Sequence, residues 1–148
     1  MSQFFAAALI LAAASPAPAP TQPDDSLAGV WMFQAAPFFA YNVTQEISGE
    51  MELKAAGDGS YTCTFSALDH IPEEEVTIRT EQTCVAVRDG DTLHIESTVI
   101  SIEPPGYNYV PDNFTLTVQG DCRMSGVMHA AGDEPVDAEF RCGGALTS

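Results

Sequence analysis

The chain offers few residues whose types and spacing could support catalysis. His70 follows Asp69 and precedes the acidic run 73–75, and imidazole and carboxylate groups are ligands for metal ions. A loop of this composition is also typical of a solvated surface turn. The other two histidines, His94 and His129, fall on the polar side of alternating segments, so we expect them on the surface.

Motifs that announce an active site are missing from the sequence. No HExxH, GxSxG or phosphate-binding glycine loop occurs, and no Cys/His or Ser/His pairing is suggested by spacing. We therefore predict no metal site and no cofactor, and we expect that the protein is not an enzyme. The chemistry that remains is binding.

The four cysteines suggest two disulfide bonds. If two strands pair across a turn at Gly132, Cys122 lies directly opposite Cys142. A hairpin turning at the PEEE sequence places Cys63 opposite Cys84 in the same way. Each bond closes a loop of about 20 residues and would stabilise the fold by ~3 kcal/mol. Four buried free thiols are the alternative.

Aromatic side chains gather in the longer connecting segments, AAPFFAYNVTQ, DHIPEEE and EPPGYNYVPDN. Aromatic rings offer flat apolar contact, and tyrosine adds a hydroxyl that can form hydrogen bonds. These segments supply our candidate ligand-binding residues, which are Phe38, Phe39, Tyr41, His70, Tyr107 and Tyr109.

Strands must position these residues, because apolar and polar side chains alternate along most of the chain. The pattern indicates no amphipathic helix after residue 25. The predicted strands are 29–34, 46–55, 60–68, 76–88, 91–102, 113–120, 122–130 and 135–142.

The predicted fold is all-β, an eight-stranded antiparallel up-and-down barrel, because closing a meander removes the exposed sheet edges. Successive connections alternate between the two ends, so tight turns near 58, 89 and 120 share one end and the aromatic segments share the other. A barrel of eight strands holds one small ligand or is filled by side chains. The side chains that could fill it completely are Tyr61, Phe65, Phe114, Met124, Met128 and Phe140.

Gly29-Val30-Trp31 opens the first predicted strand, and Arg141 lies in the last. This arrangement resembles the lipocalins and the wider calycin superfamily. The resemblance implies that Trp31 plugs the closed end of the barrel and that Arg141 packs over its ring as a cation–π contact. The chain departs from the family where the segment VQGDCR keeps only Asp121 of a Thr-Asp-Tyr-like element, and strict alternation points Arg141 away from the interior.

The N-terminal sequence, the cysteines and the net charge indicate where the protein is located and which partners are excluded. Residues 1–14 are predicted to be a signal peptide, 15–25 a Pro/Ala-rich acidic linker and 26–148 the barrel domain; the apolar run is too short to span a membrane. The leader and the cysteines favour a periplasmic or secreted protein. A net charge of −16 argues against nucleic acid and against anionic ligands.

The leading hypothesis is a lipocalin-like binding protein for a small, largely apolar, neutral or cationic ligand at the open end. The alternative is a protein-binding module with a secreted protein partner, similar to the Inh-type inhibitors of secreted proteases, which insert an N-terminal segment into the enzyme.

Overall fold

A computed structural model describes residues 27–130 and 134–143. The predicted signal peptide, the predicted linker and the turn at Gly132 lie outside the described residues. Within the described part of the chain, no helix is long and apolar enough to cross a membrane.

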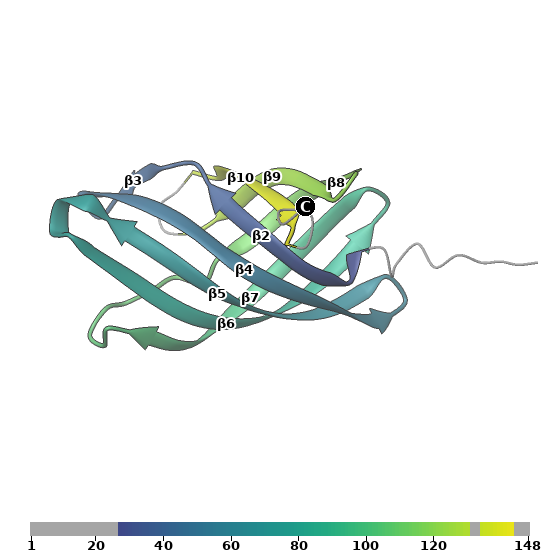
Figure 1. Ribbon diagram of the computed structural model, residues 1–148, viewed down its shortest axis with the longest axis horizontal. Coiled ribbons are helices and arrows are strands. Elements are labelled where there is room, and N and C mark those ends of the chain that lie inside the picture. The colour runs from purple at the N-terminus through teal and green to yellow at the C-terminus, as the bar shows by residue number, and fades with distance from the viewer. Residues whose placement is uncertain (1–26, 131–133, 144–148) are drawn as a thin grey trace, which may run out of the picture.

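Eight antiparallel strands form a closed barrel in meander order, which confirms the predicted fold class (Figure 1). β2 pairs with β4 on one side and with β10 on the other, and this pairing closes the sheet. The barrel strands are β2 (Gly29–Ala35), β4 (Val43–Gly57), β5 (Ser60–Ile71), β6 (Val76–Asp89), β7 (Thr92–Glu103), β8 (Asn113–Gly120), β9 (Arg123–His129) and β10 (Val136–Cys142).

Two short elements lie within segments that the sequence analysis treated as loops. β3 (Phe38–Ala40) pairs with the first residues of β4, beyond the part of β4 that pairs with β2. η2 (Pro72–Glu74) is a single turn of 3-10 helix between β5 and β6. Both elements extend the barrel wall at the same end.

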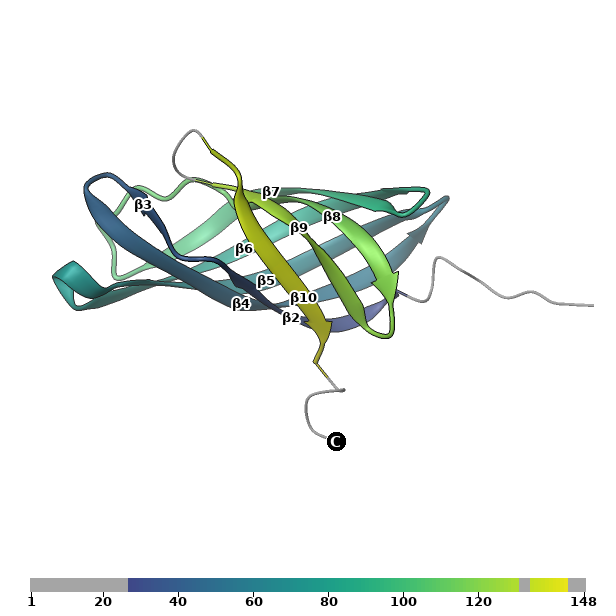
Figure 2. The same ribbon diagram turned by 90° about the horizontal axis from the view of Figure 1, so that it is seen from above.

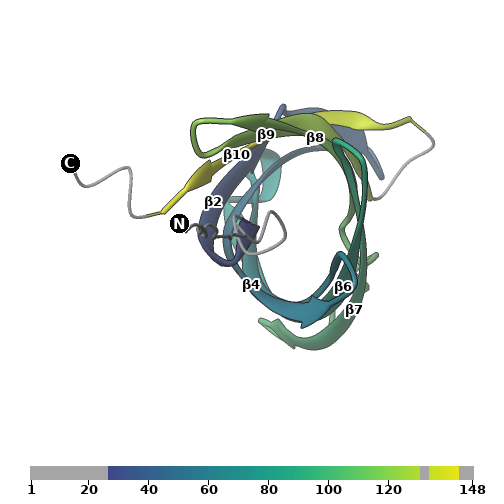
Figure 3. The same cartoon turned by 90° about the vertical axis from the view of Figure 1, so that its right-hand side faces the viewer.

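The two ends of the barrel differ as predicted (Figures 1 and 2). The tight turns that join β4 to β5, β6 to β7 and β8 to β9 lie at one end, which we call the closed end. At the first of these turns Gly57, Asp58 and Gly59 all have positive φ, which favours this composition. β3, η2 and residues 104–112 lie at the opposite end, which we call the mouth. Figure 3 shows the ring of strands from the closed end.

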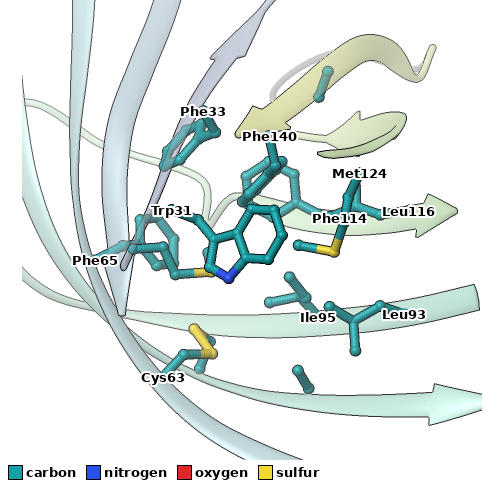
Figure 4. Close-up of a cluster of buried hydrophobic side chains, with 14 of the residues drawn as sticks. Trp31, Phe33, Cys63, Phe65, Leu93, Ile95, Phe114, Leu116, Met124 and Phe140 are labelled. Carbon is teal, nitrogen blue, oxygen red and sulfur yellow. A yellow bond between two sulfur atoms is a disulfide. The ribbon is translucent and has the colours of Figure 1, made fainter. Parts of the chain in front are cut away.

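Aromatic rings fill the middle of the barrel (Figure 4). The Phe33 ring stacks on Phe140 at a centroid distance of 5.1 Å and meets Phe114 and Phe65 edge-on at 5.3 and 5.7 Å. Trp31 lies nearer the closed end and is 3% exposed, and its indole N–H donates a hydrogen bond to the Leu27 carbonyl at 2.9 Å. Side chains that are nearly fully buried therefore pack the interior at this level.

Arg141 does not cover the Trp31 ring, so this part of the lipocalin resemblance needs correction. Arg141 pairs with Met32 on the outer face, whereas Trp31 pairs with Cys142 and points inward. The guanidinium instead lies 3.4 Å from the Glu139 carboxylate. The strand alternation keeps the arginine outside because β10 stays regular up to its last residue.

Both predicted disulfide bonds are present. Cys63 and Cys84 lie directly opposite on β5 and β6, with a Cα–Cα distance of 4.8 Å. Cys122 joins Cys142 beside the turn between β8 and β9, with a Cα–Cα distance of 5.0 Å. The registers are those that the apolar pairs predicted, including Met124 opposite Phe140.

Gly49 provides a test of this packing. It lies opposite Phe33, and a Cβ atom there would collide with the Ser66 carbonyl oxygen and lie 2.5 Å from the Phe33 Cζ. Although alanine normally suits a strand better than glycine, we expect Gly49→Ala to lower the free energy of unfolding by about 1–3 kcal/mol. Urea denaturation measures it. Ser48→Ala on the same strand should change stability by less than about 0.5 kcal/mol; equal midpoints for the two variants would contradict the predicted clash.

Candidate functional site

A cavity of about 360 Å³ lies at the mouth, beyond the layer of phenylalanine rings. Its volume falls at the small end of the range found for ligand sites, roughly 300–1,000 Å³. Its wall comes from β4, β5, β6, η2 and the segment 107–112, together with Tyr41 before β4 and Ala130 directly after β9. The lining residues are Tyr41, Val43, Gln45, Ile47, Asp69, Ile71, Glu74, Ile78, Tyr107, Asn108, Tyr109, Val110, Asp112 and Ala130.

The structure brings three of the six candidate residues together. Tyr41, Tyr107 and Tyr109 all line the cavity. Phe38 is partly buried and packs against the core cluster below the mouth. Phe39 is 68% exposed and does not line the cavity.

His70 lies outside the cavity, which corrects its placement among the candidates. It is on the outer face of β5, where its Nδ1 lies 3.1 Å from the Thr77 hydroxyl oxygen. The neighbouring Asp69 points inward, so strand alternation separates the two side chains that stood together as a possible metal pair. Among the described residues, no group of three or more His, Cys, Asp or Glu side chains is placed to hold a metal.

The acidic run has a structural role at the mouth. The Glu73 carboxylate accepts hydrogen bonds from the Thr44 N–H at 2.9 Å and from the Thr44 hydroxyl at 2.7 Å. These bonds lower the pKa of the Glu73 carboxyl, with the hydroxyl contributing most. These hydrogen bonds also connect η2 to the start of β4, and both elements contribute to the wall of the cavity.

Two buried carboxyl groups line the cavity, and the sequence analysis did not identify them as site residues. Asp69 is 2% exposed and Asp112 is fully buried. Asp69 was detectable, because it occupies an inward position of the stripe that includes Phe65 and Ala67 in β5. Asp112 could not be identified from the sequence, because it lies in an irregular segment without periodicity.

Gln82 holds Asp112 in place. Its amide nitrogen donates to the Asp112 Oδ2 at 2.9 Å, and its carbonyl oxygen accepts from the Asp112 backbone N–H at 3.1 Å. The Tyr109 hydroxyl donates to the same Oδ2 at 3.0 Å. A side chain from the interior of β6 therefore anchors the segment that closes one side of the mouth.

The barrel wall is interrupted between β7 and β8, next to residues 107–112. Pairing between β7 and β8 covers only residues 92–95 and 114–117. Beyond it, the Asn113 side-chain oxygen accepts a hydrogen bond from the Ser97 N–H at 2.8 Å. The separation of the two strands leaves space for residues 107–112 to line the cavity.

Burial raises the pKa values of both carboxyl groups, and the charge of Asp112 raises that of Asp69 further. Desolvation is the main cause for Asp69, whose pKa rises to about 7, and the charge of Asp112 adds to it. Desolvation also raises the pKa of Asp112 to about 6, against the lowering effect of its bonds from Gln82 and Tyr109. Burial and the two carboxylates raise the pKa of the Tyr109 hydroxyl as well.

Each carboxyl group keeps one oxygen without a partner. Asp69 Oδ1 and Asp112 Oδ1 are buried and accept no hydrogen bond from the described residues. No Lys, Arg or His is found among the residues that line the cavity. The site therefore combines apolar and aromatic walls with an uncompensated acidic pair.

A second hollow, of about 470 Å³, lies on the outer wall around Met32 and Leu68. Its two arginines are already paired, Arg79 with Glu81 at 2.9 Å and Arg141 with Glu139 at 3.4 Å. The mouth is therefore the stronger candidate site.

The comparisons with known proteins support the architecture and give no family. No protein-family model matches the chain, and no curated protein matches it. A solved structure, described as the de novo design of a fluorescence-activating β-barrel, matches with a TM-score of 0.52 and 14% identity, over 83% of this chain and 99% of that chain. The class that fold and comparison define is a closed eight-stranded antiparallel β-barrel. Membership of the lipocalins or calycins is not confirmed.

The buried acidic pair predicts an unusual dependence of stability on pH. The pKa of Asp69 in the folded protein, about 7, lies above the value of an unfolded aspartate, about 3.9. The proton that Asp69 retains therefore stabilises the fold fully below about pH 4, and this contribution is lost as the pH rises through 7.

We expect Asp69→Asn, which cannot ionise, to gain stability relative to wild type as the pH rises, on the order of 3 kcal/mol between about pH 4 and pH 8. Chemical denaturation at a series of pH values measures this difference. Glu52→Gln makes the same charge change on the outer face of β4 and should keep the wild-type profile. Parallel profiles for Asp69→Asn and wild type would contradict the prediction.

Proposed function

We propose that this protein binds a small, largely apolar molecule in the cavity at the mouth. The observation that supports this proposal most directly is that the barrel interior is packed in the middle and contains a cavity at the mouth. Side chains fill the barrel from Trp31 to the rings around Phe33, which we call the Phe33 cluster (Phe33, Phe65, Phe114 and Phe140). The cavity lies nearer the mouth and is lined by aliphatic and tyrosine side chains. Such a lining, with a few polar groups at fixed positions, is typical of ligand sites.

The anchoring of the mouth supports the same proposal. Gln82 fixes Asp112 on one side, and Glu73 fixes Thr44 on another. A site with walls held in place before binding loses less conformational entropy when a ligand enters. The similar designed barrel contributes only its architecture to this argument.

We further propose that the protein acts in the periplasm or outside the cell and that it binds its ligand without catalysis. Two disulfide bonds are consistent with an oxidising compartment. The apolar N-terminal segment agrees with export, although it lies outside the described residues.

Protein binding is the second candidate function. The observation that favours it is the exposure of Phe39 and Tyr41, at 68% and 71%, on adjoining positions of the β3–β4 hairpin. Exposed aromatic residues are enriched at protein interfaces. Phe39→Ser would weaken a protein complex while leaving the cavity unchanged, so it separates the two candidates.

The neutral apolar dye N-phenyl-1-naphthylamine tests the cavity. We expect it to bind the full chain with one-to-one stoichiometry and to gain fluorescence. Ala130→Trp, which fills the cavity, should weaken dye binding at least tenfold, because the ring of the dye and the indole compete for the same space. Fluorescence titration measures both.

Ala36→Trp is the matched control, since Ala36 is exposed at the same end but does not line the cavity. It should bind the dye as wild type does. Equal weakening by the two substitutions, or no saturable binding to wild type, would contradict the proposal.

A further inference from the structure

We infer that the ligand is an amphiphilic cation, a small apolar molecule with a protonated amine that lies against the carboxylates of Asp69 and Asp112. This inference rests on the proposed function and names the chemical class that the same cavity takes.

The geometry of the two carboxyl groups carries the inference. Both line the cavity, both are at least nine-tenths buried, and each has one oxygen without a hydrogen-bond donor among the described residues. A buried carboxylate without a full set of partners is costly unless a positive charge or donors compensate it. An ammonium group supplies both, since it carries one positive charge and up to three N–H donors.

The surrounding groups do not supply that compensation. The backbone N–H of Glu46 donates to Asp69, and Gln82 and Tyr109 donate to Asp112, which accounts for only part of the two carboxylates. The other titratable groups that face the cavity are Glu74, Tyr41 and Tyr107, none of which carries positive charge. A cation is therefore the chemical complement of the described lining.

The apolar lining of the cavity can contact the apolar part of an amphiphilic amine. Ile47, Ile71 and Ile78 form a buried aliphatic wall, with exposed fractions of 2, 5 and 3%. Tyrosine rings at the rim add cation–π attraction for a charged group that passes or rests over them. The net charge of −16 attracts cations to the molecule as a whole and repels anions.

The raised pKa values of the two carboxyl groups agree with this inference. Burial disfavours the negative charge of both carboxyl groups, so without a cation Asp69 is protonated at a higher pH than an ordinary aspartate. A bound ammonium favours the ionised carboxylates, so binding must release protons near neutral pH. Affinity for an amine should therefore fall as the pH drops from about 8 to about 5.

Three naphthalene probes of nearly equal size test the inference: 2-naphthylmethylamine, which is a cation at about pH 8, 2-naphthalenemethanol, which is neutral, and 2-naphthoate, which is an anion. Displacement of N-phenyl-1-naphthylamine and isothermal titration calorimetry measure their affinities. We expect the amine to bind at least tenfold more tightly than the alcohol, since hydrogen bonds to charged groups are the stronger ones, and the naphthoate to bind most weakly. Acidification to about pH 5 should weaken the amine and leave the alcohol unchanged.

Asp69→Asn and Asp112→Asn should each weaken the amine at least tenfold and change alcohol binding less than about twofold. Retained alcohol binding shows that the variant cavity is intact, and Asp69→Asn serves alone if loss of Asp112 disrupts the fold. Glu52→Gln is the matched control, because it removes one negative charge from an exposed side chain on the outer face of β4, away from the cavity. It should leave the amine-to-alcohol ratio within about twofold of wild type.

The outcomes separate this inference from the proposed function. If the dye and the alcohol bind saturably but the amine is not preferred, the inference of a cationic ligand is wrong and the proposed binding cavity is supported. The same holds if the preference for the amine persists in both Asn variants. Failure of every probe and the dye to bind overturns both. An amine preference that depends on Asp69 and Asp112 and disappears in acid supports both.

Discussion

The structure depends on the hydrogen bonds that close the sheet, those of β2 with β4 and with β10. Closure gives each wall strand two neighbours and directs alternate side chains of all eight strands into one narrow column. In a barrel of this size the column is nearly filled by side chains alone, and the Phe33 cluster does so here. Inside the barrel, the cavity lies where the wall stops being regular, which is at the mouth.

The mouth combines irregular backbone with buried polar side chains. Strands of unequal length separate there, and a polar inward residue such as Gln82 becomes possible because the irregular segment that contains Asp112 bonds to it. Two buried carboxyl groups near each other reduce stability at neutral pH, as their raised pKa values show. Perturbed groups of this kind concentrate at functional sites, where binding of a complementary ligand offsets their cost.

Side-chain direction decided which sequence predictions succeeded. Within regular strands, alternation and apolar pairing predicted the strands, the hairpin registers and both disulfide bonds, because a slip of one residue would expose the whole apolar stripe. The assignment of residues to the same group of loops predicted the candidate site less well. His70 belongs to the correct end but to the outer face, Phe39 points to solvent, and β3 was taken as loop.

The sequence by itself determined the all-β architecture, the two unlike ends and the cysteine pairing, since each follows from local alternation and turn chemistry over neighbouring segments. Only the tertiary structure decided that aromatic rings fill the middle of the barrel while a cavity remains at the mouth, and that the charge of Asp112 acts on Asp69. These features join residues far apart in the chain, and their distances depend on how tightly the closed barrel is wound and where its strands separate, which no short stretch of sequence encodes.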